Sequence, residues 1–146
     1  MSRLERTGWR DEEISSRHRS WGMHCPAVDL DFLLIEYDSG APAAVIEYKH
    51  RQCSSIDLSA NSLRALSSLA TASKIPCLVA VYYPGPWCFY VICVNAEAKA
   101  LYKHDRFLSE SRYVASLYYM RDRVRPSTGF STEVPDGLPV PRITRP

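Results

Sequence analysis

Apolar residues gather along this chain in short continuous runs, which favour buried strands. Each of four such runs predicts one β-strand, over residues 28–35, 43–49, 77–83 and 87–94. Asp38-Ser39-Gly40 is a turn signal between the first two runs, so these are expected to form a hairpin. The first run is too apolar after Asp31 to expose a face to water, and we expect it to be central in the sheet.

Apolar stripes at helical spacing predict two longer helices, and a capping signal predicts a short one. The helix over residues 57–73 has the clearer stripe, which comprises Leu58, Ser62, Leu66, Leu69 and Ala70. Asp57 or Ser59 can cap its start, and Pro76 stops it. A second helix should follow Ser109, with a stripe of Tyr113, Leu117, Met120 and Val124. The short helix covers residues 11–20, with Asp11 as its cap.

The expected order is helix, strand, strand, helix, strand, strand, helix, which is typical of the α/β class. Such an order builds a mixed central sheet flanked by helices. With 146 residues the chain suits one domain with its own core. We expect this domain over residues 1–125, followed by an extension over 126–146 that holds five of the ten prolines.

Composition and cysteine usage narrow the class of protein. Apolar residues make up 46% and charged residues 23% of the chain, as in ordinary globular domains. The five cysteines form no CxxC pair, which argues against a zinc ribbon or a redox motif. We find neither a signal-peptide pattern nor an apolar run that could cross a bilayer, so we expect a cytoplasmic protein without membrane contact.

The net charge of +2 does not by itself indicate nucleic acid, but arginines gather near both ends of the chain. Arg17 and Arg19 precede the first predicted strand and suit phosphate through their planar forks of donors. A solvated surface is the alternative, because acidic residues lie among these arginines. Four aromatic residues are candidates for base stacking, namely Tyr82, Tyr83, Trp87 and Tyr90. The alternative is core packing, which is more common for aromatic residues in strands.

The strongest chemical signal lies on the first two strands. Because side chains alternate across a strand, Glu47 and Lys49 share one face while Tyr48 points to the other. Asp29 and Asp31 likewise share a face of the neighbouring strand, and a hairpin brings the two strands together. Two converging carboxylates suit a hard cation such as Mg²⁺, and a lysine beside them can stabilise charge on phosphate. The alternative is a structural salt bridge at a strand end.

These residues resemble the motif of the PD-(D/E)xK nuclease superfamily. The similarity comprises Pro26-Ala27-Val28-Asp29-Leu30-Asp31-Phe32, then Val45-Ile46-Glu47-Tyr48-Lys49, the helix that follows and the strand over 77–83. It covers roughly residues 11–94. It implies a restriction-endonuclease-like αβββαβ core and an endonuclease that cleaves DNA with Mg²⁺ or Mn²⁺. It assigns metal ligation to Asp31, Glu47 and the main-chain carbonyl of Tyr48, and catalysis to Asp31, Glu47 and Lys49.

The chain departs from the family pattern at the aspartate and leaves several roles open. It reads Pro-x-x-Asp-x-Asp rather than Pro-Asp, so Asp29 is an alternative ligand, although the apolar run after Asp31 favours Asp31. Glu13 on the first helix is a further candidate ligand. Nucleic-acid contacts are expected from Arg17, Arg19, Asn61 and Arg64.

Two questions about assembly and activity also stay open at this level. Cutting both strands of a duplex usually needs two sites, which a homodimer would supply. The main alternative function is a catalytically inactive member of the same fold that binds nucleic acid or a protein partner. Salt-sensitive DNA binding without cleavage would favour that alternative.

Overall fold

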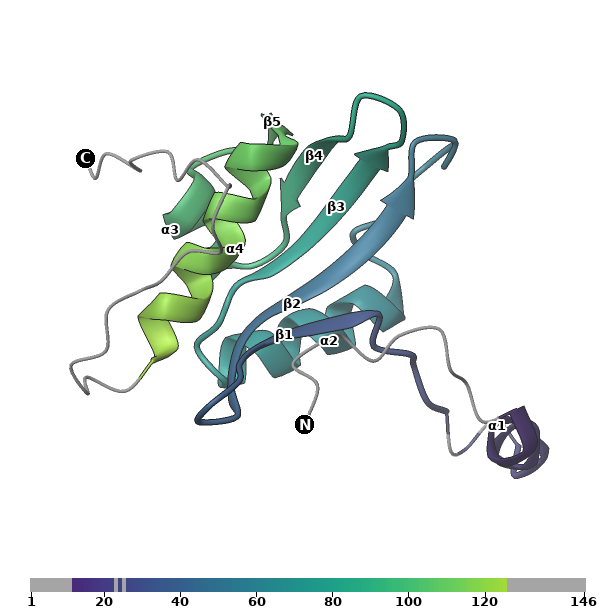
Figure 1. Ribbon diagram of the computed structural model, residues 1–146. Coiled ribbons are helices and arrows are strands. Elements are labelled where there is room, and N and C mark those ends of the chain that lie inside the picture. Colours follow the sequence, from purple (N-terminus) through teal and green to yellow (C-terminus); the bar gives the residue numbers. More distant parts are fainter. Residues whose placement is uncertain (1–11, 23, 25, 126–146) are drawn as a thin grey trace.

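The computed structural model describes residues 12–22, 24 and 26–125, which form a five-stranded mixed sheet with helices on both faces (Figure 1). The strands are β1 (Phe32–Glu36), β2 (Ala41–His50), β3 (Cys77–Tyr83), β4 (Cys88–Cys93) and β5 (Arg106–Ser109). They lie side by side in the order of the chain, and only β2 and β3 are parallel among neighbours. The predicted α/β class and the first hairpin are confirmed.

The helices are α1 (Glu12–Ser20), α2 (Asn61–Ala72), α3 (Ala96–Tyr102) and α4 (Glu110–Val124). A parallel pair needs a crossover connection, and α2 provides it between β2 and β3. In contrast, α1 has no buried residue and lies apart from the sheet (Figure 1). No helix in the described part of the chain is long and apolar enough to cross a bilayer.

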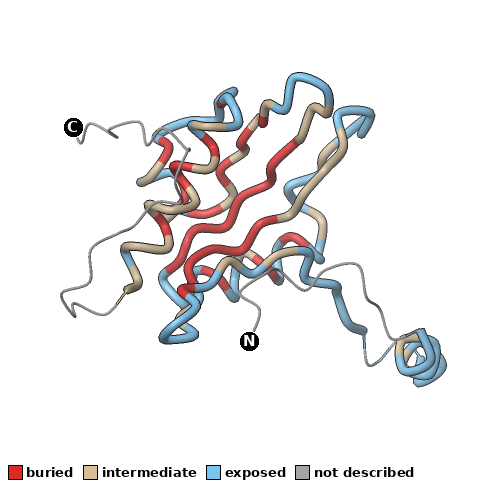
Figure 2. The backbone as a smooth tube through the Cα atoms, in the orientation of Figure 1, coloured by how far each residue is buried: buried red, intermediate tan, exposed pale blue. Residues whose placement is uncertain are grey.

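Alternation along β2 divides the core into two clusters. Val45 packs with Leu66 and Ala70 of α2 on one face. Ala44 and Ile46 belong to the larger cluster on the other face, which is completed by α3 and α4 through Ala98, Tyr102, Tyr113 and Met120. Figure 2 shows the buried residues running along the middle of the sheet. We call these two sides of the sheet the α2 face and the α4 face.

The first strand was predicted to be central in the sheet, but it is an edge strand. It begins at Phe32, four residues later than expected, and in the described sheet it pairs only with β2. Phe32 and Leu34 pack against the core, whereas Leu33 and Ile35 are 44% and 40% exposed on the α2 face. A continuous apolar run therefore marked a strand that is buried on one face only. The composition of a strand does not show how many neighbours pair with it.

The central helix also begins later than predicted. Neither Asp57 nor Ser59 caps it, because Asp57 accepts hydrogen bonds from the amide and hydroxyl of Ser59 at 2.9 and 2.6 Å, ahead of the helix. The N-cap is Ala60, without a side-chain hydrogen bond. The buried stripe is Leu63, Leu66 and Ala70, while the predicted members Leu58 and Leu69 are exposed. Leu66 and Ala70 therefore face the sheet as predicted, whereas Leu58 lies ahead of the helix.

Two elements were not predicted at all, α3 and β5. Asn95 caps α3 by accepting from the amide of Ala98 at 3.0 Å, and the same side chain bonds Cys77 and Ile75 across the sheet end. Ser109 caps α4 as predicted, accepting from the amide of Arg112 at 3.4 Å. Within the described residues two strands precede α2, where the αβββαβ core would have three. The predicted cap Asp11 and the extension over 126–146 lie outside the described residues.

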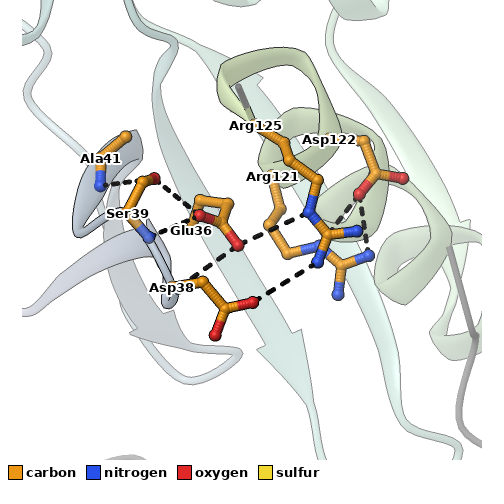
Figure 3. A network of polar contacts seen from close by, with 7 residues as sticks. All are labelled: Glu36, Asp38, Ser39, Ala41, Arg121, Asp122 and Arg125. Atoms are coloured by element: carbon orange, nitrogen blue, oxygen red, sulfur yellow. Dashed lines mark hydrogen bonds and ion pairs between the residues drawn. The ribbon is translucent and has the colours of Figure 1, made fainter. Parts of the chain in front are cut away.

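A partly buried network joins the turn of the first hairpin to the end of α4 (Figure 3). The Glu36 carboxylate accepts from the amide and hydroxyl of Ser39 at 2.8 and 2.6 Å and from the amide of Asp38 at 3.4 Å. The Arg125 guanidinium pairs with it at 3.6 Å. Chiefly because of the two hydrogen bonds from Ser39, the pKa of Glu36 is lowered. The network fixes the hairpin against α4.

Candidate active site

A cavity of about 610 Å³ opens on the α2 face, where the end of β2 meets the start of α2. Its walls come from the segment before β1, from β2 and β3, from the loop that leads into α2 and from α2 itself. The charged side chains that line it are Asp29, Asp31, Glu47, Lys49 and Asp57. Residues that the motif assigned to catalysis and to metal ligation thus line the same cavity.

Asp31 is held against β2 by the backbone. It directly precedes β1, in which Phe32 pairs with Ile46, so continuing the antiparallel register by one residue sets Asp31 opposite Glu47. Its Oδ2 accepts a hydrogen bond from the Tyr48 amide at 3.3 Å. The carboxylate therefore lies beside the segment that carries Glu47 and Lys49. Asp29 lines the same cavity, so both aspartates stay candidate ligands.

Glu47 and Lys49 share one face of β2 and form an ion pair. Lys49 Nζ donates to Glu47 Oε1 at 2.6 Å, and the two side chains are 38% and 19% exposed. This hydrogen bond raises the pKa of Lys49, and the negative charges of Glu47 and Asp31 act in the same direction while partial burial opposes them. Lys49 is thus a protonated cation at neutral pH, held next to two carboxylates.

Tyr48 separates the two faces. Its side chain points to the α4 face, where its hydroxyl lies 2.7 Å from that of Tyr113 and its ring meets Phe32 edge-on. Its main chain lies between Glu47 and Lys49 and binds Asp31. The structure thus has the alternation that the sequence predicted, and the contact between Tyr48 and the buried Tyr113 anchors β2 from behind the cavity.

The donor set suits a hard cation with retained waters. No group of three or more His, Cys, Asp or Glu side chains in a metal-binding arrangement occurs among the described residues. Mg²⁺ is commonly bound through one or two carboxylates, with water and substrate oxygens completing its shell. The carboxylates of Asp31 and Glu47 with the carbonyl of Tyr48 provide such a set, and an all-protein cage is not required.

Several predicted site residues are not brought to the cavity. Glu13, Arg17 and Arg19 lie on α1, apart from the sheet (Figure 1), and none of them lines the cavity. Asn61 and Arg64 are exposed on α2 and touch each other, with Arg64 Nη1 at 3.5 Å from Asn61 Oδ1. Neither lines the cavity, although the neighbouring Ala60 and Ser62 do. Their roles in binding nucleic acid stay predictions.

The loop from β2 to α2 contributes lining residues that the sequence did not single out. Cys53 and Ser55 line the cavity, and Cys53 Sγ lies 3.1 Å from the Ser55 carbonyl. Asp57, predicted as a helix cap, also lines it, and its hydrogen bonds from Ser59 lower its pKa. The only sequence signal that this loop lines a site was a polar segment directly after Lys49.

No protein-family model, curated protein or solved structure matches this chain, so its functional assignment rests on the geometry described above.

Proposed function

We propose that this protein is a divalent-metal-dependent nuclease of the restriction-endonuclease-like type, which hydrolyses phosphodiester bonds in DNA at the cavity on the α2 face. The observation that carries the proposal is the convergence of Asp31, Glu47 and protonated Lys49 in one open cavity. Carboxylates and an ammonium group side by side are the groups that such hydrolysis needs.

Each of the three side chains has a distinct role in this proposal. Asp31 and Glu47 would hold Mg²⁺ or Mn²⁺ together with the carbonyl of Tyr48. An ion held there would supply a water of lowered pKa and would offset negative charge on the phosphate. Lys49 donates hydrogen bonds to the phosphate oxygens as charge builds on them. Because Lys49 is bound to Glu47 in the structure, it must exchange this partner for phosphate when DNA enters.

One observation favours a second candidate, a nuclease-like fold without catalysis. The short contact between Lys49 and Glu47 neutralises both groups, as a purely structural ion pair would. Under this alternative the cavity binds nucleic acid or a protein partner, and neither side chain takes part in chemistry.

Nicking of supercoiled plasmid DNA tests the proposed function. We expect the wild-type protein to nick plasmid in Mg²⁺ or Mn²⁺ and to lose this activity in EDTA. Lys49→Ala should lower the nicking rate at least about 100-fold. Lys99→Ala, which removes an exposed lysine from α3 on the other side of the sheet, should leave it unchanged. DNA binding without any metal-dependent nicking by wild type would contradict the proposal and support the non-catalytic alternative.

A further inference from the structure

The register of the sheet extends the candidate site toward the far edge. Lys49 pairs with Val81, Val81 with Tyr90, and Tyr90 with Phe107. Side chains at directly paired positions point to the same face of a sheet. The row on the α2 face, from the cavity outward, therefore consists of Lys49, Val81, Tyr90 and Phe107.

Aromatic rings gather at the outer end of this row. The Phe107 ring lies with its centroid 4.7 Å from that of Tyr90 and 5.6 Å from that of Tyr83, both in tilted contacts. Tyr83 shares the face because it lies two residues beyond Val81 on β3. We call Tyr83, Tyr90 and Phe107 the aromatic platform.

In the described structure Phe107 is the open part of the platform, whereas Tyr83 and Tyr90 are half-buried. The α4 face receives α3 and α4, and Leu108, the neighbour of Phe107, is buried there. On the α2 face, α2 packs on β2 and β3 rather than on β4 and β5. Phe107 is 62% exposed, more than any other large apolar side chain among the described residues.

Sheet stability explains the ring contacts but not this exposure. A directly paired Tyr90 and Phe107 stabilise neighbouring strands. However, a phenylalanine at an edge strand that turns most of its ring to water gains little from burial, and a polar β-former would pair as well. An exposed ring at the end of a row that starts in the candidate site suggests a ligand with flat apolar faces.

We infer that the aromatic platform stacks unpaired nucleobases, so that the substrate of this site is DNA with a single-stranded segment. The inference rests on the proposed function, which places a phosphate at Lys49. Three strand spacings separate Lys49 from Phe107, about 14 Å, a distance that a few nucleotides of extended strand can cover. Bases inside a duplex have no free face to offer, whereas unpaired bases stack readily on aromatic side chains without sequence preference.

Fluorescence anisotropy with labelled oligonucleotides tests this inference without requiring cleavage. The probes are a fluorescein-labelled oligothymidine and a blunt duplex of equal length, titrated with full-length protein in EDTA. We expect wild type to bind the single strand more tightly than the duplex. Phe107→Ala should weaken single-strand binding about tenfold, the loss of one stacked base, and should leave duplex binding unchanged. Phe107→Trp should keep single-strand affinity because it keeps a ring.

A matched control separates stacking from general apolar contact. Leu33 is 44% exposed on the same face at the opposite edge of the sheet, and Leu33→Ala should bind both probes like wild type. Since Phe107 is mostly exposed, its removal should not unfold the domain, and a thermal melt checks this directly.

Three results would overturn the inference. The first is that Phe107→Ala binds the single strand as tightly as wild type does. The second is that wild type does not prefer the single strand to the duplex. The third is that the protein binds no oligonucleotide and forms a dimer that Phe107→Ala dissociates. The last result would assign the platform to a second copy of the chain. Tight, Phe107-dependent binding by a protein that never nicks DNA would support the platform and contradict the proposed nuclease activity, so the two failures are distinguishable.

Discussion

Two glutamates of the first hairpin show how one residue type serves two purposes. Glu36 ends β1 and is buried on the α4 face, with hydrogen bonds from Ser39 and Asp38 and an ion pair to Arg125 (Figure 3). Glu47 lies on β2 and faces an open cavity, with Lys49 at 2.6 Å. The first carboxylate is enclosed by donors, whereas the second is accessible and shares its cavity with further carboxylates.

This difference separates stability from chemistry. A buried carboxylate with several donors is expensive to disturb and has no room for a ligand. A carboxylate at a cavity, beside a flexible lysine, can exchange its partner for a cation or a phosphate at small cost. Burial and number of partners, rather than the presence of an ion pair, therefore distinguish the candidate site from the structural network. The predictions below test this distinction.

The largest expected effect is on cleavage by variants of the cavity. Lys49→Ala should lower the nicking rate at least about 100-fold, as expected when a group that stabilises charge in the transition state is removed, yet keep metal binding because lysine is not a ligand. Glu47→Ala should lose both activity and metal binding, since it removes one of few oxygen ligands. Isothermal titration with Mn²⁺ alongside the nicking assay measures both properties.

The thermal stability of the same variants provides the control. Neither change should lower Tm by more than a few degrees, because both side chains reach solvent. If both variants melt far below a wild-type protein that itself never cleaves DNA, the pair is structural and the comparison with Glu36 fails.

Glu36→Ala should have the opposite profile. It removes the acceptor for Ser39 and the partner of Arg125, so Tm should fall by about 5 °C or more while the nicking rate per folded molecule stays unchanged. Asp38→Ala is the matched control, since Asp38 is 55% exposed and reaches Arg125 only at 4.0 Å. Differential scanning calorimetry of both variants should rank Glu36→Ala well below Asp38→Ala.

The two glutamates should also differ in their response to acid. The pKa of Glu36 is lowered from its ordinary value of 4.5, so its ionised form favours the folded state. This stabilisation is complete above the pKa of the unfolded chain and is lost as pH falls through the lower pKa of the folded protein. Glu36→Gln should therefore be less stable than wild type at pH 7 and show a shallower loss of Tm below pH 4.5. Equal slopes in the two melting series would contradict this role of Glu36.

The smallest effect is expected from arginines of α1. DNA affinity should fall steeply as salt rises, and Arg17→Ala or Arg19→Ala should weaken binding modestly and for all sequences alike. Each substitution should lower the slope of affinity against salt by about 1 if the arginine contacts phosphate. An affinity that ignores ionic strength would instead indicate a protein partner.

The success of sequence-based prediction depended on local signals. The strand Cys77–Tyr83 was predicted at its observed bounds because Pro76 and Pro84 flank a continuous apolar run. The edge position of β1 could not be predicted, since it depends on which strands lie beside it. The short elements α3 and β5 were missed because each is too brief to show a period. Only Asn95 ahead of an alanine-rich segment marked the helix cap.

The candidate site was predictable to the extent that strand alternation fixes it. Alternation alone sets Glu47 and Lys49 on one face and Tyr48 on the other. The approach of Asp31 to Tyr48 followed from the hairpin. In contrast, the residues of the loop from β2 to α2 reach the cavity through the path of a crossover, which no local pattern encodes. The sequence likewise gave no signal that the helix carrying Glu13 lies apart from the sheet.

Anomalous diffraction from crystals soaked in Mn²⁺ tests the central claim most directly. The account predicts one strong manganese peak between the carboxylates of Asp31 and Glu47, with Lys49 turned away from Glu47, and no peak at the enclosed Glu36. A cavity without manganese, in which Lys49 still binds Glu47 at saturating Mn²⁺, would contradict the account.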